Sequence, residues 1–305
     1  MKTQKNNLVE IVILGVLGLL VVLSILIPQL LRDRGEPRLL SLSVLLRDTD
    51  SAAFAAARQG MEQAADELGA ELRFLTPTVQ SDSREQAELL RREAEGGADA
   101  LIVLPVDTAS LSAALDQLSS PPPVVSLGSG LDRGTGTVTP DGGALGRALA
   151  QALLEDWDGG KVLLLDSRSV CPEAGPRLDA ALEALVQAGV PAEMAAGLPE
   201  RGADWVMTFE PGATRRAGAQ KIAEGLDFAL YGVGSSTAVT AQLERRTISA
   251  VAAWSDYAAG YLAVRQAVQA VRGQPEELEP LSFFIVRGED IYAPDNQKLL
   301  FPVTS

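Results

Sequence analysis

Apolar and polar positions along this chain repeat as a short apolar run, a polar turn and an amphipathic helix pattern. Residues 98–115 show the unit clearly: an apolar run at 101–104 is followed by Pro105 and Asp107, and then by apolar residues at helical spacing. Such a run is typical of a strand buried in a parallel sheet, followed by a crossover helix. Because open parallel sheets bind ligands at the carboxyl ends of their strands, the corner at 105–107 is a candidate wall of a binding site.

The same unit predicts an α/β protein with two sheets. Strands are expected at 39–46, 71–75, 101–104 and 123–127, and then at 161–165, near 192, and at 204–208, 228–233, 248–252 and 281–286. Helices are expected at 51–68, 83–95, from 109 onward, and at 142–156, 176–188, 214–224, 235–245 and 256–271. The Gly- and Thr-rich segment 128–140 interrupts the rhythm, and we place a crossing between two lobes there.

An apolar segment at residues 8–31 is interrupted only by Glu10, Ser24 and Gln29. A helix of this length crosses a hydrocarbon core of about 30 Å. Neither a small-x-small cleavage site nor a cysteine for lipidation follows it, so we expect an uncleaved transmembrane anchor, with a charged linker at 32–38. A buried core helix is the alternative. Basic residues are nearly balanced on the two sides, so the charges leave the orientation open.

Charge and composition exclude several classes of function. The formal net charge of −14 and a pI near 4.5 argue against a nucleic-acid partner, because phosphate binding needs a basic surface. The sequence has no histidine and one cysteine, Cys171, so an intramolecular disulfide, a Cys/His zinc site and a histidine-activated nucleophile are excluded. We therefore expect no cofactor and no enzymatic activity, although a catalytic carboxylate pair stays open, and we expect Cys171 to be a buried thiol.

Five stretches of the sequence carry a family resemblance: SVLLRDTDSAAFAAARQGMEQAADELG, GADALIVLPVDTASL, PPVVSLGSG with TVTPDGGALGRALA, LYGVGSSTAV, and AVAAWSDYAAGYLAV. In this order they resemble the type 1 periplasmic (sugar-type) solute-binding proteins, the ribose- and galactose-binding group whose fold LacI-like regulators share. The C-terminal DNQKLLFPV also resembles the ending of solute-binding lipoproteins from Gram-positive bacteria. The resemblance covers roughly residues 40 to 305.

This resemblance implies two doubly wound parallel-sheet lobes, joined by a three-strand hinge and enclosing a small ligand on closure. The first lobe would comprise 39–138 plus 254–280, and the second 139–253 plus 281–305. It also implies an orientation: residues 1–7 form a cytoplasmic tail, and the soluble part lies outside the cell on a single-pass membrane anchor.

The resemblance further implies which residues contact the ligand. Phe54 matches the position where the family places an aromatic ring against the ligand. Asp141 matches an acidic residue of the family at the start of the first helix of the second lobe, and Arg177 matches an arginine of the second lobe. The full set of candidate ligand-binding residues is Arg47, Asp48, Asp50, Phe54, Asp107, Ser129, Asp141, Arg177 and Trp254.

Each of these roles has a structural alternative. Asp50, Asp107 and Asp141 stand where helix N-caps are expected. Phe54 begins the inward apolar stripe of its helix and is equally well explained as a core residue. Arg177 lies near a helix start, where a solvated side chain is the alternative.

Departures from the family pattern affect the expected ligand. Leu104, Gly128 and Gly234 stand where sugar binders often carry polar residues, and Trp254 stands in place of a glutamine. A cleft with fewer polar contacts is expected to hold a pentose or hexose less tightly. This leaves three alternatives: a less hydroxylated or aromatic ligand such as a nucleoside or base, a weakly binding sensor, or no small ligand at all.

We therefore expect an extracytoplasmic solute-binding protein that delivers a small organic ligand to an ABC permease. The alternative is a membrane-tethered sensor that reports ligand binding to a membrane sensor kinase. A LacI-type regulator is disfavoured, because a membrane segment occupies the place of a DNA-binding helix pair.

Overall fold

The structure is a computed structural model that describes residues 38–47, 51–198, 203–294 and 296. The chain divides into two compact units, Met1–Leu39 and Leu40–Ser305, and every described strand and helix lies in the second. The predicted membrane segment at 8–31 lies outside the described residues. Within them, no helix combines the length and the apolar character that a membrane crossing needs.

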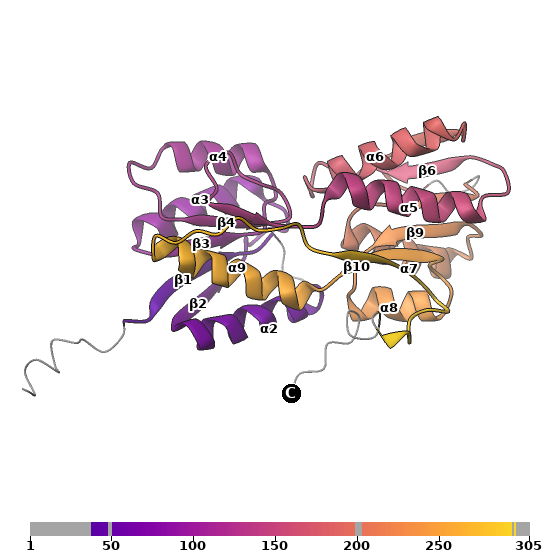
Figure 1. Ribbon diagram of the computed structural model, residues 1–305. Coiled ribbons are helices and arrows are strands. Elements are labelled where there is room, and N and C mark those ends of the chain that lie inside the picture. The colour runs from indigo at the N-terminus through magenta and orange to yellow at the C-terminus, as the bar shows by residue number, and fades with distance from the viewer. Residues whose placement is uncertain (1–37, 48–50, 199–202, 295, 297–305) are drawn as a thin grey trace, which may run out of the picture. The chain divides into compact units, whose positions relative to one another are not determined.

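One sheet of the second unit has five strands in the order β2-β1-β3-β4-β5, and all neighbouring pairs are parallel (Figure 1). Its strands are β1 (Leu40–Leu45), β2 (Ala70–Leu75), β3 (Ala100–Val103), β4 (Val124–Leu127) and β5 (Gly136–Val138). Every residue of β3 and β4 is buried, because helices cover the sheet on both faces.

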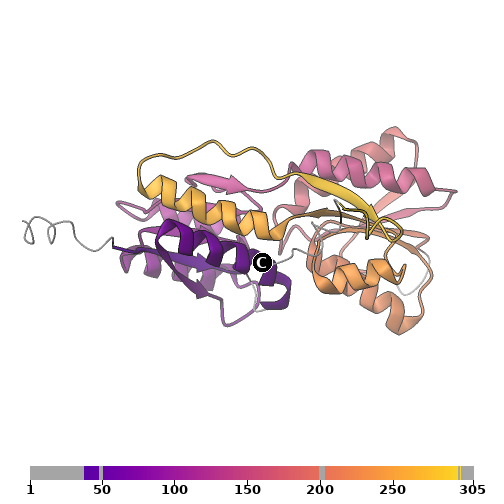
Figure 2. The ribbon, with the colours of Figure 1, turned by 60° about the horizontal axis from the view of Figure 1, so that its bottom comes forward.

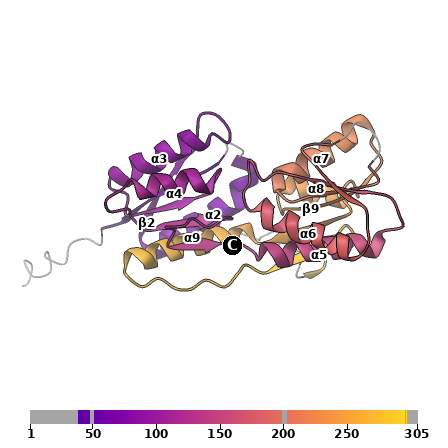
Figure 3. The same cartoon turned by 90° about the horizontal axis from the view of Figure 1, so that it is seen from above.

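Two helix pairs provide that cover. The first pair is α2 (Ser51–Leu68) and α9 (Asp256–Val271), and the second is α3 (Ser83–Glu95) and α4 (Thr108–Asp116). Alternate strand residues divide between two cores: Val44 and Ile102 pack with the first pair, and Leu45 and Val103 with the second. Figure 3 shows the two pairs on opposite sides of the strands.

The other sheet has six strands in the order β11-β10-β9-β8-β6-β7. Its strands are β6 (Val162–Leu165), β7 (Ala192–Ala195), β8 (Trp205–Thr208), β9 (Ala229–Val233), β10 (Ala250–Trp254) and β11 (Phe283–Arg287). Helices α5 (Gly142–Asp156) and α6 (Ala174–Gln187) cover one face, and α7 (Pro211–Glu224) and α8 (Thr237–Glu244) the other.

Both lobes were expected to be parallel throughout, and β11 is an exception because it pairs antiparallel with β10. The chain leaves β10 through α9, which packs on the five-stranded sheet, and then returns along an extended connection (Figure 2). It re-enters the six-stranded sheet from the carboxyl end of β10, so the last strand runs back along its neighbour. The lobe limits given above remain predictions.

Two other expectations need correction. Within the segment 128–140, where we placed a crossing between two lobes, residues 136–138 form a strand that we did not predict, β5, which pairs with β4 at the sheet edge. The helix expected at 214–224 begins three residues earlier, at Pro211, because the Glu210 side chain caps it and proline is favoured at a first helical position.

Helices α2 and α9 pack with their backbones almost in contact, as Figures 1 and 2 show from two directions. A Cβ atom on Gly60 would lie 2.0 Å from the carbonyl oxygen of Tyr257, and one on Gly260 would lie 1.9 Å from that of Ala57. Any larger residue would push the helices apart. The start of α9 is thereby fixed against the first turns of α2.

A buried glutamine of α3 holds the loops that follow β1 and β3. The Gln86 amide donates to the carbonyl oxygens of Leu46 at 3.1 Å and Leu104 at 2.8 Å, and its Oε1 accepts from the amide of Val106 at 2.9 Å. Gln86 is fully buried, so no water replaces these bonds. One side chain therefore fixes two strand ends of the same sheet edge.

We expect Gln86→Met to lower the free energy of unfolding by about 1–3 kcal/mol, because it leaves buried backbone groups without partners. Urea denaturation measures the change. Gln63→Met on the exposed surface of α2 is the matched control, and we expect a change of about 0.5 kcal/mol or less for it. Equal effects of the two substitutions would contradict the role of Gln86.

Candidate ligand-binding site

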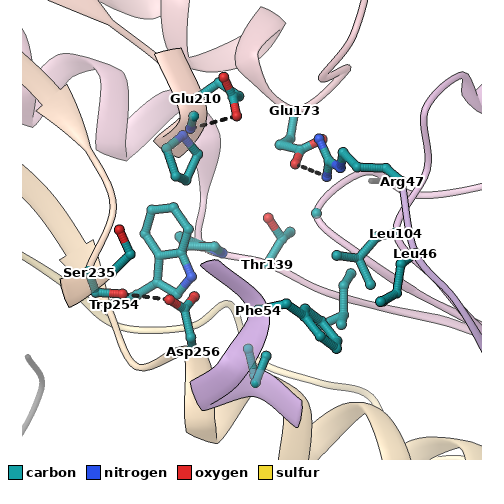
Figure 4. A pocket seen from close by; sticks show the side chains of 18 of the residues that line it. Leu46, Arg47, Phe54, Leu104, Thr139, Glu173, Glu210, Ser235, Trp254 and Asp256 are labelled. Carbon is teal, nitrogen blue, oxygen red and sulfur yellow. Dashed lines mark hydrogen bonds and ion pairs between the residues drawn. The ribbon is translucent and has the colours of Figure 1, made fainter. Parts of the chain in front are cut away.

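A cavity of about 400 Å³ lies at the carboxyl ends of strands from both sheets, within the unit Leu40–Ser305. The residues at these strand ends that line it are Leu46, Arg47, Leu104, Gly128, Glu210, Ser235 and Trp254. Figure 4 shows side chains of both sheets around one shared space. This is where open parallel sheets bind ligands, so the topology alone makes the cavity the candidate site.

An ion pair between Arg47 and Glu173 joins the two sides of the cavity (Figure 4). Arg47 follows β1, Glu173 precedes α6, and Nη2 of the arginine lies 2.5 Å from Oε1 of the glutamate. The two side chains are only 14% and 11% exposed. Burial by itself opposes both charges, but their attraction outweighs it, so the pKa of Arg47 is raised and the pKa of Glu173 is lowered. Both groups are therefore charged at neutral pH.

The carboxylate of Glu173 lies against the loop that follows β4. Gly128 has a φ of +96°, and a Cβ there would lie 2.8 Å from the carboxyl carbon of Glu173. Ser129 Oγ donates to Oε2 of Glu173 at 3.3 Å. Gly128, which appears in the sequence as a lost polar side chain, thus leaves room for a carboxylate that comes from the opposite side of the cavity.

Arg177 lies in the first turn of α6 and is only 2% exposed. Its Nη1 donates to the carbonyl oxygen of Phe209 at 3.0 Å, and its guanidinium carbon lies 5.0 Å from the ring centre of Trp254. Burial lowers the pKa of Arg177. Helix α5 fixes the backbone here, because a Cβ on Gly146 would lie 2.0 Å from the carbonyl oxygen of Arg177.

Two aromatic side chains give the cavity apolar surface, which suits the faces of rings. Phe54 belongs to both the core and the cavity: its ring packs edge-on against Phe74 at 6.2 Å, and it also lines the cavity. Trp254 ends β10 beneath the guanidinium of Arg177.

Asp256, the first residue of α9, lies in the cavity wall opposite Phe54 (Figure 4). Ser235 Oγ donates to its Oδ2 at 2.6 Å. Burial nevertheless raises the pKa of Asp256, against the opposing effects of the hydrogen bonds from Ser235 and Trp254 and of the charge of Arg177. A buried carboxyl group of this kind binds a proton more readily than an exposed one.

The comparisons with known proteins match this arrangement of sheets. The sequence profile of the periplasmic binding protein domain matches residues 42–275, which is most of the chain. The chain belongs to this family. The fold is therefore the α/β periplasmic binding protein fold with two lobes, and no curated protein matches the chain.

Solved structures with the fold of this periplasmic binding protein have low sequence identity to it. A carbohydrate transporter solute-binding protein from Agrobacterium radiobacter, in complex with D-arabinose, is 16% identical, with a TM-score of 0.75 over 87% of this chain and 100% of that chain. An ABC transporter solute-binding protein from Agrobacterium vitis with bound D-fucose is 15% identical, with a TM-score of 0.76 over 86% and 100%. The Caulobacter myo-inositol binding protein is 19% identical, with a TM-score of 0.72 over 87% and 98%.

In this periplasmic binding protein, four of the predicted ligand-binding residues line the cavity: Arg47, Phe54, Arg177 and Trp254. Ser129 is next to it, through its bond to Glu173. These five residues come from separate stretches of the chain, and the fold brings them together. Their roles in ligand binding stay predictions.

Two other predicted residues, Asp107 and Asp141, lie outside the cavity. Asp107 accepts from the amide of Ser110 at 2.9 Å and caps α4, and Asp141 accepts from the amide of Ala144 at 2.7 Å and caps α5. The structural alternative therefore explains both of them, and neither lines the cavity. Asp48 and Asp50 lie outside the described residues.

Sequence reasoning missed two carboxylates of the cavity, Glu173 and Asp256. Asp256 comes directly after a strand end at a chain crossing, which is a usable signal. Glu173 carries no such signal, because its partner is 126 residues away. Cys171 is buried as expected, and burial, together with the nearby Glu173, raises its pKa to about 12.

We expect Asp256→Asn to raise the melting temperature at about pH 7, because it removes a buried charge and keeps an acceptor for Ser235. A raised pKa means that the folded state binds protons more readily than the unfolded state. This residue therefore costs stability as the pH rises from the unfolded pKa, near the ordinary value of 3.8, through the folded pKa. The gain from Asp256→Asn should shrink as the pH falls toward about 4.

Thermal unfolding at several pH values tests this expectation, with the exposed Asp66→Asn of α2 as the control. A lower melting temperature for Asp256→Asn than for the wild type at neutral pH would contradict it.

Proposed function

We propose that this chain is the solute-binding component of an ABC importer and that it captures a small sugar or sugar-like molecule in the cavity between its lobes. The single observation that carries the proposal is the cavity of about 400 Å³ at the strand ends of both sheets. Its volume falls within the range of small-molecule sites. The fold neighbours with bound D-arabinose and D-fucose and the myo-inositol binding protein support a ligand of this class.

The side chains of the cavity suit such a ligand. Phe54 and Trp254 offer flat apolar surfaces, and Arg47 and Arg177 offer hydrogen-bond donors in a fixed fork. Because the lining residues come from both lobes, a bound ligand contacts both at once and favours the closed arrangement. The site would bind and release its ligand without chemical change.

We also propose that the soluble part lies outside the cytoplasmic membrane, anchored by residues 8–31. Family membership supports the extracytoplasmic location, and the apolar sequence supports the anchor. The tethered-sensor and nucleoside alternatives have no separate support among the comparisons, so we do not propose them.

We expect the ligand to raise the melting temperature of the full-length chain, purified in a sugar-free detergent. A panel of pentoses, hexoses, inositols and their sugar acids provides the probes. A ligand at a hundred times its Kd adds about 2.7 kcal/mol of stability, which corresponds to a rise of several degrees. No rise with any member of the panel would contradict the proposal.

Trp254→Leu should weaken binding of the same ligand by about tenfold or more, since it removes an aromatic wall that is worth at least about 1.4 kcal/mol. Titration calorimetry measures the change in Kd. Trp157→Leu is the matched control, because Trp157 donates to Gly160 at the end of α5 and does not line the cavity. Equal losses in both variants would show that the effect does not come from the cavity.

A further inference from the structure

Arginines gather around the cavity of a strongly acidic protein. The chain has a formal net charge of −14, yet four arginines are among the described lining residues: Arg47, Arg177, Arg215 and Arg216. Three carboxylates also line it, those of Glu173, Glu210 and Asp256, so four positive and three negative groups leave a formal balance of +1. The cavity therefore differs in charge from the chain as a whole, and its positive balance favours an anionic ligand.

Two of the lining carboxylates are already bound within the protein. Glu210 accepts from the amides of Gly212 at 2.6 Å and Ala213 at 2.5 Å, and Arg216 donates to it at 3.2 Å. Asp256 accepts from Ser235 and is partly buried in the wall. Arg216 is thus paired with Glu210, and Arg215 has an interaction of its own. The other two lining arginines are Arg47 and Arg177.

Arg47 and Arg177 share one carboxylate, that of Glu173. Arg47 is in direct contact with it, and the positive charge of Arg177 is close enough to help keep it ionised. Arg177 has no charged hydrogen-bond partner among the described residues: its Nη1 donates to a neutral carbonyl group, and its buried Nε has no hydrogen-bond partner. A second carboxylate here would therefore be attracted by both guanidinium groups.

The carboxylate of Glu173 occupies a site, here called its seat, that residues of the opposite lobe form. Gly128 leaves room for it, Ser129 donates to it, and Arg47 pairs with it. Glu173 itself is the N-cap residue of α6 but makes no hydrogen bond to the amides of its own helix. Carboxylates are favoured at the N-terminus of a helix. If another carboxylate displaces that of Glu173, the Glu173 side chain can therefore turn to the N-terminus of α6.

We infer that the ligand is a sugar acid, and that its carboxylate takes the seat between Arg47 and Arg177 that Glu173 occupies in this structure. Glu173 is then an internal competitor that holds the two lobes together until the ligand replaces it. This inference rests on the proposed function, because it names the class of sugar that the same cavity captures.

The first test compares acids with their neutral counterparts on the wild-type full-length chain. The probes are D-glucuronate, D-galacturonate and D-gluconate, each measured beside its primary amide by titration calorimetry. We expect at least one acid to bind about tenfold or more tightly than its amide, because a hydrogen bond between charged groups is roughly twice as strong as a neutral one.

The second test uses variants of the pair. Glu173→Ala should tighten binding of that acid by about tenfold, because the competitor is gone, while binding of the amide stays unchanged or weakens. Arg47→Met should abolish the preference for the acid. The controls are Glu62→Ala and Arg58→Met, which remove the two partners of an exposed ion pair on α2 outside the cavity.

The outcomes separate the two proposals. If neutral sugars bind as tightly as the acids, the sugar-acid inference is wrong and the proposed function stands. Weaker binding of the acid by Glu173→Ala would overturn the competitor role, since Glu173 would then contact the ligand. Binding of D-glucose 6-phosphate without binding of any carboxylate would overturn the choice of anion. No binding of any sugar, neutral or acidic, would overturn the proposed function and the inference with it.

Discussion

Parallel strands that are covered by helices on both faces can offer chemistry to a ligand only at their ends. Both sheets of this protein are built in this way apart from the antiparallel β11, and each buries its central strands between two helix pairs. The cavity lies at the carboxyl ends of these strands. The shape of the cavity therefore depends on the positions of those strand ends. The buried Gln86 fixes two of them, because it bonds the backbone just after β1 and β3.

The charged groups of the cavity show how burial and pairing compete. Arg47 and Glu173 lie close enough for attraction to outweigh desolvation, so both stay charged. For Asp256, burial outweighs the hydrogen bonds and the charge of Arg177, so the pKa of its carboxyl group is raised. A buried ion pair contributes little net free energy to folding. We therefore expect the pair Arg47–Glu173 to favour the arrangement of the lobes in which the two side chains meet.

Local patterns in the sequence predicted much of the fold. The predicted bounds of α2, α3, α5 and α9 agree with the structure, because apolar periodicity and clear cap residues such as Asp82 and Asp141 mark them. Strand β5 was missed because its Gly and Thr residues resemble a loop. Of the candidate site, the strand-end residues Arg47 and Trp254 were found through the family resemblance. Glu173 was not, because its role depends on a partner that only the fold brings near.

A single residue, Ser255, separates the end of β10 from the start of α9. Trp254 packs in the core of the six-stranded sheet, whereas α9 is fixed by backbone contact to α2 on the five-stranded one. Trp254 and Asp256 thus belong to two different lobes, although only Ser255 separates them. If the lobes rotate against each other, the backbone dihedrals around Ser255 must change. The indole of Trp254 and the carboxyl group of Asp256 change their mutual contact with that rotation. The chain has three tryptophans, so in a variant that keeps Trp254 alone the emission would report this contact.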